Sequence, residues 1–159
     1  MAAALRVGAP MDRLRPELGG IPRVAHRLQA IPPIDGIAIY DNAVSTVPES
    51  TMSAIEALPR GIRWIAGGKT KASRSRALAR LAAERCACIY SYGDAGPELA
   101  RALEPSGAPA VVCATLAQAF ERARRDARPG EVILYSPAFP SFDQYRNFTE
   151  RGAGIPFRW

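Results

Sequence analysis

The sequence is poor in cysteine and has no long apolar run. Its three cysteines, Cys86, Cys88 and Cys113, fit neither a zinc site nor a disulfide framework, so we expect small buried residues in a reducing compartment. No apolar stretch approaches the roughly 20 residues that cross a bilayer. Residues 1–11 contain one arginine and lack the apolar core of a secretory signal. These absences predict a cytoplasmic protein with no membrane partner.

Lysine and histidine are also scarce. The net charge is +6, yet Lys69 and Lys71 are the only lysines among the 21 basic residues. Lysine offers a compact point charge and arginine a planar fork, so two neighbouring lysines indicate a site that needs an ammonium group, with chance as the alternative. The arginines are spread along the chain without a helix-turn-helix, RNP or zinc-finger pattern, so we expect no nucleic-acid partner. The single histidine, His26, is interpreted as structural.

From Gly36 onward, short apolar strands alternate with helices of about ten residues. This pattern predicts an α/β, Rossmann-like domain with a mostly parallel sheet and helices on both faces. The helix at 116–127 has the clearest signal, because its apolar residues recur at helical spacing and Thr115 with Gln118 forms a capping box. Strands are expected at 37–40, 62–66, 86–92, 110–113 and 132–135, and helices at 50–58, 74–85, 97–103, 116–127 and 141–151.

Ligands of such sheets bind at the carboxyl ends of the strands, so the loops after residues 40, 66 and 135 are the informative ones. The first loop, residues 41–51, is rich in Asp, Asn, Ser and Thr, which bind either local backbone or a ligand. The second runs from Gly67 to Lys71 and contains a Gly-Lys-Thr triplet. It is not a P-loop, because Arg63 occupies the position of the required first glycine. Glycine backbone followed by lysine still suits an anion.

The third loop leads into the last expected helix. Ser141 occupies the N-cap position, where its hydroxyl and the first free amides point outward together. Such a helix start can hold a carboxylate or a phosphate. Plain capping is the alternative, although it would not explain the long Ser-Pro-Ala lead-in that begins at Ser136.

These loops, in this order, resemble the C-terminal domain of the Mur ligase family, and within it the glutamate-adding MurD type. The family's last loop has the pattern Ser-Pro-Ala-x-x-Ser-x-Asp-x-[Phe/Tyr]-x-x-Phe-x-x-Arg-Gly, and residues 136–152 fill every defined position. Weaker matches are the His26-Arg27 pair, the Gly67-Gly68 loop and Pro-Glu-Ser-Thr at 48–51. Together they cover nearly the whole chain.

The resemblance implies an ATP-dependent amide ligase that adds glutamate to UDP-N-acetylmuramoyl-L-alanine in peptidoglycan synthesis. By position in the family's motifs, the side-chain carboxylate of glutamate would be held by Thr46, Lys71 and Ser141, with Phe148 packing nearby. Arg27, Asp41 and Asn42 would contact the nucleotide. ATP and Mg²⁺ would be held mainly by a central domain, so we expect no catalytic residue and no metal site here, and no activity of this chain alone.

The domain assignment follows the same resemblance. Residues 1–20 would be helical and belong to the end of the central ATPase domain, 21–35 would be a linker with a short strand near 27–30, and 36–159 would be the Rossmann-like domain. The sequence departs from the family in the first loop, where the order Asn-Asp is reversed and a lysine is replaced by Val44. A non-catalytic module that binds an amino acid, nucleotide or protein is therefore the alternative, and the choice between D- and L-glutamate stays open.

Overall fold

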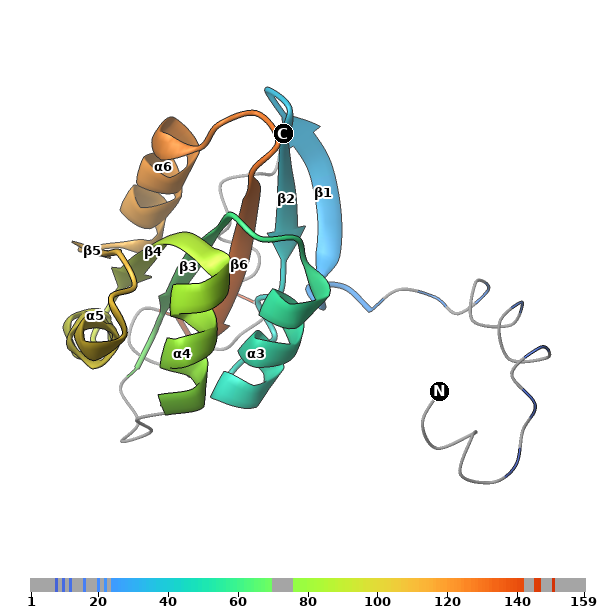
Figure 1. Ribbon diagram of the computed structural model, residues 1–159, viewed down its shortest axis with the longest axis horizontal. Coiled ribbons are helices and arrows are strands. Elements are labelled where there is room, and N and C mark those ends of the chain that lie inside the picture. Colours follow the sequence, from blue (N-terminus) through green and yellow to red (C-terminus); the bar gives the residue numbers. More distant parts are fainter. Residues whose placement is uncertain are drawn as a thin grey trace.

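The computed structural model shows a six-stranded sheet with helices on both faces (Figure 1). It describes residues 24–69 and 76–141 and the single residues 8, 10, 12, 16, 20, 22, 145, 146 and 150. The strand order is β1-β2-β6-β3-β4-β5, and every neighbouring pair is parallel except β1 and β2. The fold is the α/β, Rossmann-like one that the alternating pattern predicts.

The expected strands at 86–92 and 110–113 match β4 and β5, and the other matched elements differ from expectation by one to three residues at an end. The strands are β1 Gln29–Ile34, β2 Ile37–Asp41, β3 Ile62–Gly67, β4 Cys86–Tyr92, β5 Ala110–Cys113 and β6 Val132–Ala138. The helices are α3 Pro48–Ala57, α4 Arg76–Arg85, α5 Gly96–Leu103 and α6 Leu116–Asp126, with a short 3₁₀ turn, η1, at Glu104–Ser106.

Strand β6 is the last of the described strands in sequence but lies between β2 and β3. Tyr135 in β6 pairs with Asp41 in β2 on one side and with Ile65 in β3 on the other. The carboxyl ends of these three strands therefore lie level with one another. The loops that follow them meet at one edge of the sheet, which we call the carboxyl edge.

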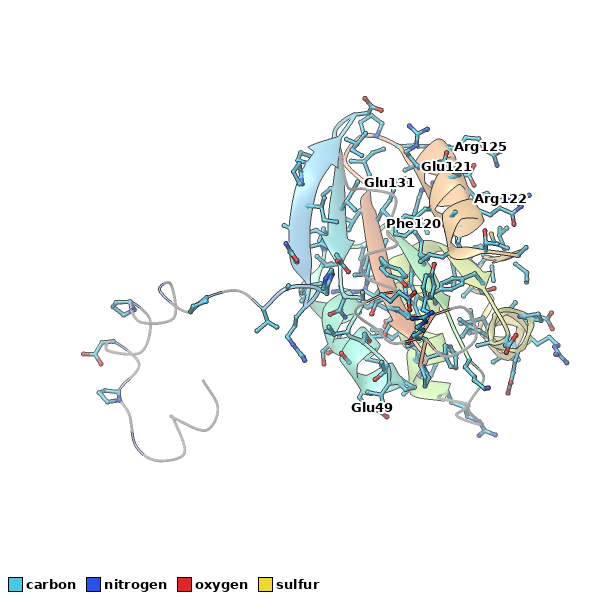
Figure 2. The ribbon with its side chains drawn as sticks, turned by 180° about the vertical axis from the view of Figure 1, so that it is seen from behind. Glu49, Phe120, Glu121, Arg122, Arg125 and Glu131 are labelled. Carbon is cyan, nitrogen blue, oxygen red and sulfur yellow. The ribbon has the colours of Figure 1, made fainter. Side chains whose placement is uncertain are left out.

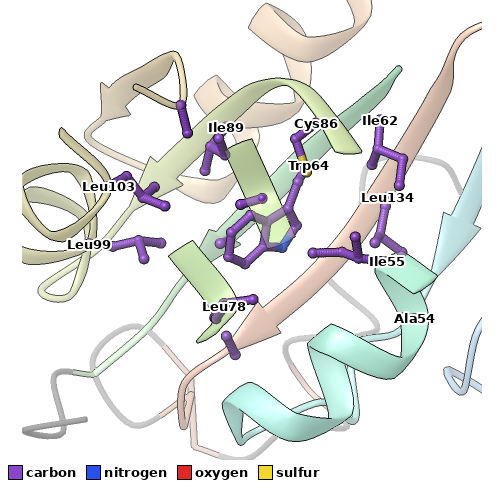
Figure 3. Packing of buried hydrophobic residues seen from close by; sticks show 14 of the residues in the cluster. Ala54, Ile55, Ile62, Trp64, Leu78, Cys86, Ile89, Leu99, Leu103 and Leu134 are labelled. Atoms are coloured by element: carbon purple, nitrogen blue, oxygen red, sulfur yellow. The ribbon is translucent and has the colours of Figure 1, made fainter. Parts of the chain in front are cut away.

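Helices α3, α4 and α5 cover one face of the sheet, around Trp64 (Figure 3). Trp64 has no exposed surface, and the cluster around it includes Ile55, Leu78 and Leu99. Its indole Nε1 donates to the backbone carbonyl of Ser136 at 2.7 Å, so the polar atom of the ring has a partner. Burying a large side chain of this kind contributes about 2–3 kcal/mol.

Helix α6 covers the opposite face. Its apolar stripe is buried as expected, and the ring of Phe120 lies 5.3 Å from that of Tyr135 in β6. Arg122 and Arg125 project from α6 into solvent (Figure 2). The helix is amphipathic in the ordinary way, with its arginines on the solvated side.

The expected capping box at the start of α6 is present in a slightly altered form. The Thr115 hydroxyl accepts the backbone N–H of Gln118, as predicted. The Gln118 side chain accepts the N–H of Ala114 at 2.8 Å, one residue before the expected partner. The observed bonds satisfy two backbone N–H groups at the helix start, as many as the expected capping box would.

The segment 21–35, expected to be a linker, supplies a strand to the sheet. Strand β1 begins at Gln29, later than the expected short strand at 27–30, and pairs antiparallel with β2 as an edge strand. The helical segment expected within residues 1–20 and the helix expected at 141–151 lie mostly outside the described residues. In the part of the chain that the structure describes, every helix is too short or too polar to span a bilayer.

An ion-pair network joins three elements near the amino ends of the strands. Arg63 Nε donates to Glu131 at 2.6 Å, and Arg63 Nη1 donates to the Tyr90 hydroxyl at 2.9 Å. The Tyr90 hydroxyl in turn donates to Asp126. Burial raises the pKa of Glu131, but hydrogen bonds from Arg63 and the Arg128 backbone outweigh it and hold that pKa below its usual value. None of the described site residues takes part in these bonds, so we interpret the network as structural.

We expect Glu131→Gln to lower the free energy of unfolding by about 1–2 kcal/mol near neutral pH, because charged hydrogen bonds from Arg63 are lost. Folding lowers the pKa of Glu131, so its contribution is complete above the usual value of 4.5 and disappears as the pH falls through the lowered one. Urea unfolding across this range should show the two proteins converging in acid.

The control is Glu121→Gln, because that carboxylate is 66% exposed and 3.5 Å from Arg124. Such an exposed pair should change stability little at any pH. A stability gap between wild type and Glu131→Gln that persists in acid would contradict the account.

Gly67 ends β3 in a conformation with φ of +153°, and an added Cβ would lie 2.1 Å from the Tyr92 carbonyl oxygen. We expect Gly67→Ala to destabilise the protein by about 2–4 kcal/mol, because strand β4 would have to move. Gly61→Ala is the matched control: its φ is +87°, but nothing lies within 4 Å of the added Cβ, so backbone strain of about 1 kcal/mol is the expected cost. Equal destabilisation in thermal unfolding would show that the close approach does not matter.

Candidate functional site

The three informative loops meet at the carboxyl edge. The backbone N–H of Lys69, in the loop after β3, donates to the carbonyl of Pro140, in the loop after β6, at 2.8 Å. The Gly68 carbonyl accepts the N–H of Ala95, after β4, also at 2.8 Å. These bonds fix the lysine-bearing loop against the residue that precedes Ser141.

A chain of buried polar side chains ties the loop after β2 to β6. The Ser45 hydroxyl lies 2.7 Å from that of Thr51, which lies 2.8 Å from that of Ser136. The Asn42 side-chain amide donates to the Ser136 hydroxyl at 3.0 Å, and all four residues are buried. Leaving one such group unpaired would cost about 1–3 kcal/mol, so each member constrains the others. We call these four residues the hydroxyl network.

The hydroxyl network also sets the position of Thr46. The Ser45 carbonyl accepts the backbone N–H of Ala138 at 3.1 Å, which joins this loop to the end of β6. Thr46 follows directly and is half-buried at the carboxyl edge. Its placement near the β6 loop therefore depends on backbone and side-chain bonds of its neighbour.

The chain leaves β6 through a strained residue. Ala138 has a φ of +65° and is buried, a conformation that costs a non-glycine residue about 1–2 kcal/mol. Three residues later, Ser141 is 2% exposed, and its carbonyl accepts the N–H of Tyr145 at 3.0 Å, a bond of helical spacing. Strain of this kind often accompanies functional loops.

Asp41, at the end of β2, is buried and already has protein partners. One carboxylate oxygen lies 2.6 Å from His26 Nδ1, and the other accepts the backbone N–H of Ala43 at 2.9 Å. The expectation for this residue was contact with a nucleotide. In this structure its carboxylate faces the segment before β1.

Asn42 is engaged in the same way. Its side-chain oxygen accepts the backbone N–H of Leu28 at 3.1 Å, while its amide nitrogen belongs to the hydroxyl network. Arg27 lies between His26 and Leu28, and its side chain is exposed. Of the three residues assigned to the nucleotide, Arg27 is exposed, whereas Asp41 and Asn42 are buried.

The structure thus gathers five of the seven predicted site residues around the ends of β2 and β6: Arg27, Asp41, Asn42, Thr46 and Ser141. Lys71 and Phe148 lie outside the described residues. The bond from Lys69 to Pro140 places the start of the loop that carries Lys71 beside Ser141.

Sequence reasoning missed the hydroxyl network and the pairing of His26 with Asp41. A signal for the network existed, since Ser136 stands between a buried apolar strand and a proline, where an unpaired hydroxyl would be costly. No comparable signal marks the His26–Asp41 hydrogen bond, because the two residues are 15 positions apart and on different segments.

A concave surface lies between α4, α5 and η1, and we call it the α4–α5 groove. Its volume is about 630 Å³. It is lined by Arg76, Ala79, Arg80, Glu98, Arg101, Ala102, Pro105 and Ser106. None of the five site residues that the structure describes lines it.

Two solved structures with a similar fold come from ligases. A murein peptide ligase from Psychrobacter arcticus matches 87% of this chain and 32% of its own, with a TM-score of 0.56 and 15% identity. The second is a ligase domain from Haemophilus ducreyi, described as acting on UDP-N-acetylmuramate and a diaminopimelate-containing peptide. It matches 70% of this chain and 88% of its own, with a TM-score of 0.55 and 19% identity. At these identities the likeness shows the fold alone.

Curated relatives are similar in sequence as well. The UDP-N-acetylmuramoylalanine–D-glutamate ligase of Chlorobaculum tepidum is 36% identical over 152 residues, which are 96% of this chain and 32% of the relative. The ligase of the same name from Symbiobacterium thermophilum is 35% identical, over 96% of this chain and 34% of the relative. The chain therefore spans about a third of the length of these relatives.

The model of one protein family matches residues 26–139, a range that holds the whole described sheet, the hydroxyl network and both members of the His26–Asp41 pair. That family is described as the Mur ligase, glutamate ligase domain. Since the match covers well over half of the sequence, this chain belongs to the C-terminal, glutamate ligase domain family of the Mur ligases.

Proposed function

We propose that this chain is the glutamate-binding and nucleotide-closing domain of a cytoplasmic, ATP-dependent ligase that adds glutamate to UDP-N-acetylmuramoyl-L-alanine. The observation that carries the proposal is the bond from Lys69 N–H to the Pro140 carbonyl. It brings the loop that contains both lysines against Pro140, the residue that precedes Ser141. An ammonium group and a helix start that converge on one point suit a carboxylate.

In this proposal Thr46 and Ser141 donate hydroxyl hydrogen bonds to the side-chain carboxylate of glutamate, Lys71 supplies the opposite charge, and Phe148 packs against the chain. Holding the carboxylate leaves the amine free to face an acyl phosphate on the second substrate. The amine nitrogen forms the amide bond as phosphate leaves. The contribution of this domain is orientation, which converts an encounter between separate molecules into a step within one complex.

The nucleotide requires a different set of groups. Arg27 is the exposed cation that would approach the ATP phosphates when this domain closes over its neighbour. The residues that the structure describes include no group of three carboxylate, imidazole or thiol side chains suited to a metal ion. In the complete enzyme the central domain would hold Mg²⁺, which would neutralise phosphate charge there.

One observation favours a second candidate, a non-catalytic module that kept the fold. Val44 occupies the place of a family lysine, and its side chain is half-buried. Such a module would bind an amino acid, a nucleotide or a protein without supporting a reaction.

The two candidates are separated by adding this chain to a glutamate ligase from which the corresponding C-terminal third has been removed. Phosphate release is followed with UDP-N-acetylmuramoyl-L-alanine, ATP and either enantiomer of glutamate. We expect release that requires glutamate, and the active enantiomer identifies the substrate. Absence of release under conditions where the two pieces form a complex would favour the non-catalytic module.

We expect Lys71→Ala and Ser141→Ala each to lower glutamate-dependent phosphate release by about 100-fold or more, because the carboxylate is no longer held in line. Thermal unfolding should show both variants folded. Ser53→Ala is the matched control, since that hydroxyl is on the exposed face of α3 and bonds only the Glu49 carbonyl. Unchanged glutamate dependence in both site variants would refute the assignment.

A further inference from the structure

The segment before β1 has an unusual backbone. His26 has a φ of +60° and Leu28 a φ of +43°, although neither is glycine. Residues other than glycine rarely adopt this left-handed backbone conformation, and surrounding contacts must compensate for its cost. Two such residues flank Arg27, so the direction in which Arg27 leaves the backbone depends on both.

The compensating contacts come from the end of β2. Asp41 holds the His26 ring through Nδ1 at 2.6 Å, and Asn42 accepts the Leu28 N–H at 3.1 Å. The His26 carbonyl also accepts the backbone N–H of Val44 at 3.3 Å. Asp41 and Asn42 are 4% and 3% exposed, so these bonds form away from competing water.

We propose that Asp41 and Asn42 are positioning residues that hold residues 26–28 in this conformation and thereby aim Arg27 at the nucleotide, instead of contacting the nucleotide themselves. We call the two residues the clamp pair. The inference rests on the proposed function for the role of Arg27, whereas the clamp itself rests on geometry alone.

The order of the clamp pair is compatible with the bonds that each position makes. Asp41 faces two donors, the His26 ring and the Ala43 N–H, and an ionised carboxylate accepts both. Asn42 accepts from the Leu28 N–H and donates to the Ser136 hydroxyl, and an amide does both. The reversal of the family's Asn-Asp order therefore matches the bonds that these positions make here.

The clamp can be tested on this chain by ¹⁵N NMR, because His26 is the only histidine. In the wild type we expect the neutral imidazole to carry its proton on Nδ1, facing Asp41. Asp41→Asn should shift the tautomer toward Nε2, and both Asp41→Asn and Asn42→Ala should speed amide exchange of Leu28 by about tenfold or more. Asp35→Asn is the matched control, an exposed carboxylate in the turn between β1 and β2.

Near-ultraviolet circular dichroism shows whether each variant is folded. If one variant does not fold, the tautomer of the wild-type ring still tests the clamp. A wild-type ring protonated on Nε2 alone, or Leu28 exchange that is unchanged in both folded variants, would overturn the clamp.

The effect on Arg27 is tested in the assay with the shortened ligase. We expect Asp41→Asn to raise the KM for ATP by about tenfold, as loss of a supporting contact commonly does, while the KM for glutamate stays within about twofold. An unchanged KM for ATP would refute the positioning role. If the wild-type chain itself supports no glutamate-dependent release, the proposed function fails, and the NMR measurements still decide the clamp.

Discussion

The hydroxyl of Ser136 and its carbonyl join the three central strands at the place where they end. The hydroxyl bonds Asn42 after β2 and Thr51 in α3, and the carbonyl accepts the indole N–H of Trp64 from β3. Because Ser136 has no exposed surface, water cannot replace any of these partners. The relative position of β2, β3 and β6 at the carboxyl edge therefore depends on one buried serine.

Ser136 and its hydrogen-bond partners are close in sequence to the residues of the candidate site. Thr46 follows Ser45 of the hydroxyl network, Ser141 lies five residues beyond Ser136, and the clamp pair includes Asn42. The site residues thus lie beside the buried hydroxyl network, which holds their backbone in place before a ligand binds. Preformed geometry of this kind reduces the entropy that a ligand must lose on binding.

The sequence was sufficient for the elements with strong local signals. Strands β4 and β5 are bounded apolar runs, and α6 has helical spacing with a cap, so all three matched closely. Strand β1 lies in the segment that was expected to be a linker with a short strand, and it contains Pro32 and Pro33. An edge strand tolerates proline where its N–H needs no partner. The His26–Asp41 pair could not be predicted, because it depends on how β1 pairs with β2 and not on any local pattern.

The most direct test of the central claim is to locate the bound glutamate. The ¹⁵N-labelled chain would be titrated with UDP-N-acetylmuramoyl-L-alanyl-glutamate, the expected product, while backbone amide shifts are followed. The account predicts the largest changes at the carboxyl edge, at Thr46, Lys69 and Ser141. Changes confined to the α4–α5 groove, or no changes at the highest ligand concentration reached, would contradict it.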